Sequence, residues 1–174
     1  ADPGNVRIFT DEVAQVSYRV LVEADSSDPG AEEFLRQFTL GARGTPGGVS
    51  LDARLPWRMF HARFGMTFEI HVPRRYNLKI NTQGGNIEVQ DLDGRVDLVT
   101  GGGNITVGRI GPPVETDDLQ SSTNRAGRIT ELLATQGGHI TIGDVAGPLR
   151  ATTSGGYITT GNIGGDGILR TGGG

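Results

Sequence analysis

The stretch TQGGNI, from Thr82 to Ile87, decides the fold, because closely similar hexapeptides return three more times along the chain. The threonines that open these copies, together with one more near residue 171, are separated by 18, 35, 18 and 18 residues. A constant interval is typical of repeat architectures, in which each unit buries its apolar side against the next. The further copies are TGGGNI at Thr100, TQGGHI at Thr135 and TSGGYI at Thr153, and the last threonine is Thr171.

Apolar residues stand at fixed offsets from each threonine and alternate with polar ones. Leu78 and Ile80 precede the first threonine, and Ile87, Val89 and Leu92 follow it. Alternation with a period of two indicates β-strands with one buried face. Each unit therefore contains two strands and a third, shorter one, joined by bends, with the small apolar side chains pointing inward.

An interval of 18 residues suits one closed coil, and such coils stack about 4.8 Å apart with parallel strands. We therefore expect an all-β fold, a single-stranded parallel β-helix (β-solenoid) with about 18 residues per coil. The 35-residue interval indicates one further, irregular coil between 111 and 128, or a loop that bulges from the stack. In the extra coil, Val114 and Asp118 would take the places of Val96 and Thr100.

Glycine pairs mark one corner of every coil, where we expect positive φ and a close approach of stacked backbones that a Cβ would obstruct. The threonine column and the column of Asn86, Asn104, His139 and Tyr157 then have a structural explanation, because stacked polar side chains can hydrogen-bond along the axis. The predicted corner pairs are Gly84 and Gly85, Gly102 and Gly103, Gly137 and Gly138, and Gly155 and Gly156.

The first 75 residues lack the 18-residue interval but keep strand-like alternation at 16–22, 49–53 and 66–72. We expect residues 1–75 to form N-terminal strands and a capping helix, continuous with the solenoid coils of residues 76–174. The helix is predicted from Pro29 to Gln37, with Asp28 as its cap. With aromatic residues it should cover the open first coil, because bare strand edges promote aggregation. These aromatic residues are Phe9, Trp57, Phe60, Phe64 and Phe68.

Composition argues against several classes of partner and cofactor. The formal net charge of −4, without runs of like charge, is unlike that of proteins that bind nucleic acid or anionic membranes. No stretch approaches the roughly 20 apolar residues of a membrane span. The chain has no cysteine, and His61, His71 and His139 stand far apart in the sequence. We therefore expect no nucleic acid, no membrane insertion, no cofactor and no metal.

Acidic residues gather around one corner and define a candidate ligand surface. It contains Asp91, Asp93 and Asp97 with the neighbouring Arg95 and Arg109. Paired carboxylates can cleave a glycosidic bond or bind calcium, although such acids more commonly form a solvated turn. Neither the G-x-S-x-G nucleophile motif nor a phosphate-binding loop before a helix is present. We therefore predict no catalytic residue and a protein that is not an enzyme.

The stretch from FEIHVPRRYNLKINTQGGNIEVQDLDG to VDLVTGGGNITVG resembles the bacterial adhesin-like β-solenoid domains of unknown function. The resemblance rests on the strand that ends at Val72-Pro73 and runs into repeated T-x-G-G-x-I corners. It implies an extracellular or cell-envelope location, and it supplies no catalytic residue.

The predicted function is that of a non-enzymatic, exported or cell-surface β-solenoid that acts as a structural or adhesion module. The chain stops at Gly174 in the middle of a corner, which indicates either an incomplete end or an open C-terminal coil that self-associates end to end. A surface glycan or a protein is the expected ligand. Two alternatives stay open: a carbohydrate-binding or polysaccharide-cleaving β-helix that uses the candidate ligand surface, and a cytoplasmic filament subunit of the bactofilin kind.

Overall fold

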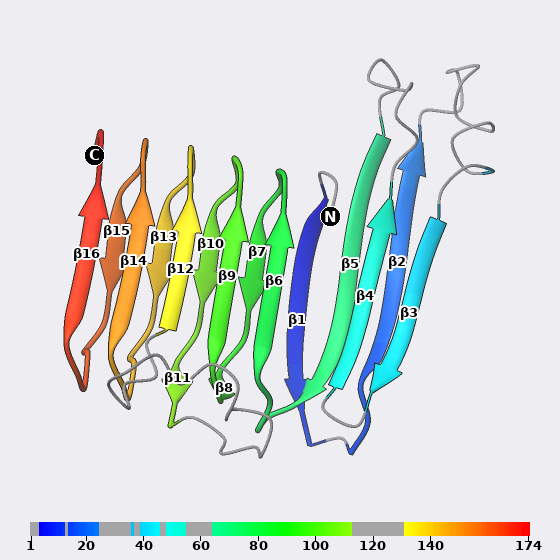
Figure 1. The fold of residues 1–174 in the computed structure, drawn as a ribbon, viewed down its shortest axis with the longest axis horizontal. Helices are drawn as coiled ribbons and strands as arrows, with labels where there is room; N and C mark the ends of the chain where they lie inside the picture. Colours follow the sequence, from blue (N-terminus) through cyan, green and yellow to red (C-terminus); the bar gives the residue numbers. More distant parts are fainter. Residues whose placement is uncertain are drawn as a thin grey trace.

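The computed structural model describes residues 4–12, 14–24, 36, 39–45, 48–54, 64–112 and 131–174. This part of the chain is all-β, with mostly parallel sheets (Figure 1), so the predicted class is confirmed. The elements with defined bounds among the described residues are all strands. Of the capping helix predicted from Pro29 to Gln37, only Arg36 lies within the described residues, where it is in helical conformation.

The first two repeats each supply a five-residue, a three-residue and a two-residue strand, the later repeats lack the third strand, and the sequence before them supplies five strands. These five are β1 (Asn5–Asp11), β2 (Ser17–Ala24), β3 (Thr39–Thr45), β4 (Gly48–Arg54) and β5 (Phe64–Pro73). The first and second coils contain β6 (Leu78–Thr82), β7 (Ile87–Val89), β8 (Leu92–Asp93), β9 (Val96–Thr100), β10 (Ile105–Val107) and β11 (Ile110–Gly111). The later coils contain β12 (Glu131–Thr135), β13 (Ile140–Ile142), β14 (Leu149–Thr153), β15 (Ile158–Thr160) and β16 (Gly167–Thr171).

Strands from equivalent places in the repeats pair in parallel and in register. One sheet has the order β16-β14-β12-β9-β6, and a second contains the run β15-β13-β10-β7. The third side consists of the β8–β11 pair, continued by single bridges from Ile110 to Val145 and from Val145 to Ile163. In the second sheet, the successive register partners are Ile87, Ile105, Ile140 and Ile158, which therefore lie in one file as the sequence predicted.

The inward columns form one hydrophobic core that runs along the stack. Three-residue strands such as β10 bury their first and last side chains and expose the middle one. Ile105 and Ile140 are completely buried, and so are Leu98 and Leu133 in the opposite sheet. Burial of such a side chain contributes about 1.5 to 3 kcal/mol. The core therefore follows directly from the period-two alternation in the sequence.

The 35-residue interval corresponds to one coil with an insertion, and the predicted extra coil is wrong. Strand β9 pairs directly with β12, with Leu98 opposite Leu133, and β10 pairs directly with β13. Hydrogen-bonded neighbours leave no room for a strand between β9 and β12, so the column of Thr100 continues directly with Thr135. Val114 and Asp118, which the predicted extra coil would place in these columns, lie outside the described residues. Of the inserted segment, residues 113–130 lie outside the described residues.

Strand β1, which the sequence analysis missed, covers the edge of the first coil in the second sheet. It pairs in parallel with β7 on one side and with β5 on the other, and β2 then adds to β5 in antiparallel orientation (Figure 1). The edge of β7 is thus paired with a strand, and the predicted helical cover lies outside the described residues apart from Arg36. The signal was present in the sequence, because Gly4-Asn5-Val6 matches Gly85-Asn86-Ile87, but no threonine precedes it at the usual place.

The predicted aromatic cover is only partly present. Phe68 is buried in the core, whereas the ring of Phe9 stacks on His71. Trp57 and Phe60, and the side chain of Phe64, lie outside the described residues. The predicted strands at 16–22, 49–53 and 66–72 are confirmed as parts of β2, β4 and β5, and β4 forms an antiparallel pair with β3.

Candidate functional site

From Thr100 onward, each threonine of the repeat donates a hydrogen bond to a glycine carbonyl of the preceding corner, whereas Thr82 donates to Gly84 in its own corner. Thr100 Oγ1 donates to the carbonyl oxygen of Gly85 in the preceding coil at 3.0 Å and accepts from the N–H of Gly103 in its own corner at 3.4 Å. Thr135 repeats this arrangement with Gly103 and Gly138. Thr100 and Thr135 are buried, so these bonds satisfy polar groups that water cannot reach. The threonine column therefore stabilises the stacking of successive corners.

A second column connects the outer side of the same corner. Asn86 N–H donates to Asn5 Oδ1, Asn104 N–H to Asn86 Oδ1 and His139 N–H to Asn104 Oδ1, at 2.8 to 2.9 Å. In the last step Tyr157 N–H donates to His139 Nδ1 at 2.9 Å, and the two rings stack nearly parallel. Each side-chain acceptor thus satisfies the backbone N–H of the next coil.

The second glycine of each corner pair is required by its surroundings, because a Cβ there would overlap a neighbouring backbone. A Cβ on Gly103 would overlap the carbonyl oxygen of Gly85, and one on Gly138 would overlap that of Gly103. A Cβ on Gly102, in contrast, would meet no atom within 4 Å. Positive φ is found at only one of the eight predicted corner glycines, Gly85, with φ of 97°. The expectation of positive φ at every corner is therefore wrong, and close backbone stacking explains the pattern.

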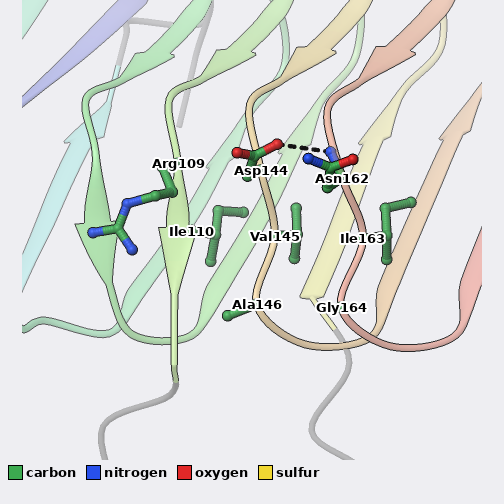
Figure 2. Close-up of a pocket in the computed structure, with 8 residues that line it drawn as sticks. All are labelled: Arg109, Ile110, Asp144, Val145, Ala146, Asn162, Ile163 and Gly164. Atoms are coloured by element: carbon green, nitrogen blue, oxygen red, sulfur yellow. Dashed lines mark hydrogen bonds between the residues drawn. The ribbon is translucent and has the colours of Figure 1, made fainter.

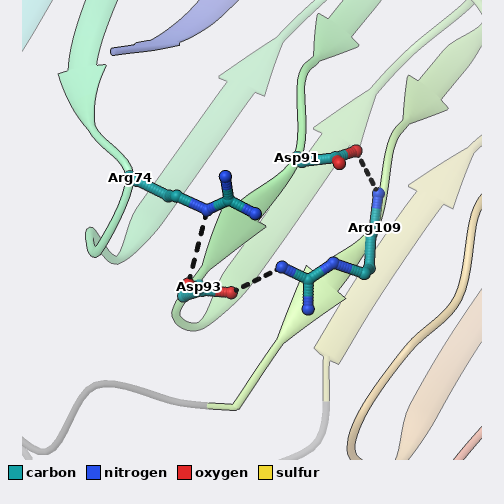
Figure 3. A network of polar contacts seen from close by, with 4 residues as sticks. All are labelled: Arg74, Asp91, Asp93 and Arg109. Carbon is teal, nitrogen blue, oxygen red and sulfur yellow. Dashed lines mark hydrogen bonds and ion pairs between the residues drawn. The ribbon is translucent and has the colours of Figure 1, made fainter. Parts of the chain in front are cut away.

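Three residues of the predicted ligand surface come together beside a fourth that the sequence analysis missed (Figure 3). Asp93 Oδ1 lies 3.2 Å from a guanidinium nitrogen of Arg109, and Asp93 Oδ2 lies 3.6 Å from Nε of Arg74. Asp91 Oδ1 accepts from the backbone N–H of Arg109 at 2.8 Å. Arg74 directly follows the Val72-Pro73 strand end, and that position was its only signal in the sequence.

The carboxylates of this cluster already have protein partners. Asp93 is shared by two guanidinium groups, and its carboxylate lies so close to Gly111 that a Cβ there would overlap it. The two arginine side chains are about half exposed, so each ion pair contributes about 1 kcal/mol or less. The arrangement fastens the end of β5 to the first and second coils, and it can present guanidinium N–H groups to an anion.

The other two residues of the predicted surface lie elsewhere. The backbone N–H of Arg95 donates to Asn77 Oδ1 at 2.8 Å, at the bend that leads into β9. Asp97 lies within β9, in register with Lys79 of β6 and Leu132 of β12, and it belongs to a different sheet from the Asp93 cluster. The five predicted residues therefore do not form one site.

A shallow hollow of about 290 Å³ lies beside the third side of the stack (Figure 2). The side chains of Ile110, Val145 and Ile163 form a row along it, and Asp144 Oδ1 accepts from the N–H of Asn162 at 2.7 Å at its rim. Figure 2 shows the side chain of Arg109 directed away from this row. Among the described residues, the hollow therefore has a mainly apolar wall without a charged group aimed into it.

His71 and Asp11 form a polar pair outside the repeats. His71 Nδ1 lies 2.6 Å from Asp11 Oδ2, and the imidazole ring stacks on Phe9 with the centroids 4.9 Å apart. Ser17 stands opposite His71 in the register of β2 and β5, but no hydrogen bond joins their side chains in the described structure. The pair ties β1 to β5.

Searches for other kinds of site in the described ranges add two findings. No group of three or more His, Cys, Asp or Glu side chains there could hold a metal ion. No helix of the described part is long and apolar enough to cross a membrane.

Comparison with known proteins adds no family assignment. The chain matches no protein-family model, and no curated protein matches its sequence. The resemblance to the adhesin-like β-solenoid domains therefore stays a prediction.

Proposed function

We propose that residues 76–174 form a β-solenoid that acts as a non-enzymatic structural or adhesion module at the cell surface or outside the cell. The observation that carries the proposal is the continuous pairing of equivalent strands, with Ile87, Ile105, Ile140 and Ile158 in register. Such a stack is filled by its own side chains. What it offers to partners is its flat outer faces and its ends.

The engaged polar groups support a structural role. The buried threonines bond to corner glycines, and the outer column of Asn86, Asn104 and His139 bonds to the next coil. Asp93, the central carboxylate of the predicted ligand surface, is held by Arg74 and Arg109. These groups hold the stack together, which is how a rigid scaffold uses its polar side chains.

Self-association through the edge formed by β15 and β16 is part of the proposal. Leu169 continues the inward column of Leu98 and Leu133, but it is 45% exposed whereas they are completely buried. Its neighbour Ile168 is 44% exposed. Unpaired strand edges with exposed apolar side chains favour pairing with another strand. We propose that the strand that pairs with the edge of β15 and β16 belongs to a second copy of the chain.

Sedimentation velocity across a range of protein concentrations tests the self-association. The 174-residue chain should shift to larger species as concentration rises, and Leu169→Lys should stay monomeric because a charge at the joined edge is costly to bury. Thr106→Lys, on an exposed position of β10 in the middle of the stack, is the matched control and should associate like the unchanged chain. A chain that is monomeric at all concentrations would contradict this part of the proposal.

The polysaccharide-cleaving alternative has its own test. If the Asp93 cluster were catalytic, the protein would release reducing ends from acidic polysaccharides, and Asp93→Asn would abolish this activity. We expect no turnover. Turnover that depends on Asp93 would replace the structural proposal by an enzymatic one.

A further inference from the structure

The second sheet has seven strands in the order β15-β13-β10-β7-β1-β5-β2, and among the described residues the outer surface of one part of it has no charged groups. The middle residues of β10, β13 and β15 are Thr106, Thr141 and Thr159, which are exposed and successive register partners. Beside them, at the corner, stand the exposed side chains of Asn104, His139 and Tyr157. We call these six residues the uncharged face.

The same sheet is charged on the strands that come before this face. Thr106 is in register with Glu88 of β7, which forms an ion pair with Arg7 of β1 at 3.3 Å. Arg7 is in turn opposite Glu69 of β5, and Glu69 is opposite Arg19 of β2. The change from alternating charges to hydroxyl groups therefore occurs within one continuous row of register partners.

The polar groups of the uncharged face retain hydrogen-bonding capacity. Oδ1 of Asn104 accepts from His139 N–H, which leaves the Nδ2 amide group without a hydrogen bond among the described residues. The hydroxyl groups of Thr106, Thr141 and Thr159 likewise form no hydrogen bond within the described ranges. Tyr157 is 65% exposed and adds an aromatic ring with a hydroxyl group. Threonine hydroxyl groups thus repeat at the strand spacing of about 4.8 Å, beside one asparagine amide group and one tyrosine ring.

We propose that the uncharged face binds a neutral polysaccharide. A charged partner would lose hydration here without finding an opposite charge, which is unfavourable, whereas sugar hydroxyl groups can pair with threonine and asparagine. An extended glycan repeats its hydroxyl groups along its length, as the face repeats its own along the stack. Because the strands are fixed by the stack, little side-chain and backbone entropy is lost on binding, and weak contacts on successive rungs add up.

This inference rests on the proposed role as an adhesion module and names its ligand class. Its site is different from the Asp93 cluster, whose guanidinium groups suit an acidic polymer. The two sites therefore differ in the charge of the glycan that they would hold.

Co-sedimentation of the full 174-residue chain with insoluble cellulose, chitin and β-1,3-glucan tests the proposal, with alginate and polygalacturonate in affinity electrophoresis as the acidic arm. We expect binding to at least one neutral polymer and a loss of about tenfold or more in affinity for Thr141→Glu, which places a charge at the centre of the face. Tyr157→Ala, at an exposed corner, should weaken binding without affecting folding. Thr152→Glu, on β14 in the opposite sheet, is the matched control and should bind like the unchanged chain.

Three results would overturn the inference: no binding to any of the three neutral polymers, equal binding by Thr141→Glu and the unchanged chain, or binding only to the acidic polymers. Circular dichroism of each variant separates loss of binding from loss of fold. Sedimentation velocity keeps the two proposals apart. A chain that associates but binds no neutral glycan contradicts this inference alone, and a monomer that binds glycan contradicts only the self-association.

Discussion

Asn104 Oδ1 accepts a 2.8 Å hydrogen bond from the backbone N–H of His139, although 35 residues separate the two along the chain. The equivalent bonds from Asn104 to Asn86 and from Tyr157 to His139 each span 18 residues. The corner geometry is thus the same with and without the insertion. The stack therefore determines the register, and the length of the connecting chain does not.

The first prediction concerns the inserted segment. Replacement of residues 112–130 by Gly-Arg, the dipeptide at 94–95, restores the 18-residue interval. The free energy of unfolding should stay within about 1 kcal/mol of the original or rise, because a shorter connection closes at a lower entropy cost. Urea unfolding followed by circular dichroism measures this change. A shortened chain that fails to fold would show that the insertion is needed for the stack.

The second prediction concerns the threonine column. Thr135→Val keeps the shape of the side chain but leaves the Gly103 carbonyl and the Gly138 N–H without their partner. Unsatisfied buried groups cost about 1 to 3 kcal/mol, so the midpoint of urea unfolding should fall. Thr135→Ser keeps the hydroxyl group and is the control, which should recover most of the loss. Equal stability of the valine and serine variants would show that the hydroxyl group is unimportant.

The third prediction separates the two glycines of one corner. Gly103→Ala should destabilise the protein by about 2 to 3 kcal/mol, because the new Cβ overlaps the backbone of Gly85 and only a backbone shift can relieve the overlap. Gly102→Ala, one residue earlier, meets no atom within 4 Å and should be nearly neutral. Thermal unfolding of both variants tests the contrast. The reverse order of stability would contradict the stacking explanation.

The fourth prediction concerns the one ring acceptor in the outer column. His139→Asn replaces Nδ1 by an amide oxygen, as at Asn86 and Asn104, and should preserve the hydrogen bond from Tyr157 N–H. His139→Leu removes the acceptor and should speed hydrogen exchange at the Tyr157 amide by about tenfold, as expected for the loss of roughly one hydrogen bond. If both variants exchange at the rate of the unchanged protein, the bond contributes nothing to the corner.

Much of the core could be predicted because it depends on short-range periodicity. The alternation around Ile105 and Ile140 places both side chains inward whatever surrounds them, and the repeated threonines place both strands at the same point of successive coils. Gly103 and Gly138 could be predicted for the same reason, although the identity of the atom that they approach could not.

The candidate site was predicted less well. Asp91, Asp93 and Arg109 come together because the side chains of one coil lie above those of the next, which the interval of 18 already indicates. Asp97 points from another sheet, and Arg74 joins from the strand before the repeats. The sequence analysis grouped Asp97 with the cluster because the two are close in the sequence. It missed Arg74 because this residue precedes the repeats.

By itself, the sequence determined the all-β class, the stacking interval and the identity of the inward columns, because these depend on spacing within about twenty residues. Only the tertiary structure decided that β9 is the neighbour of β12 and that β1 completes the edge of the second sheet. Both choices join strands that are far apart along the chain. Their outcome depends on which edges are free to form backbone hydrogen bonds and on which apolar faces remain to be covered, and local spacing carries no information about either.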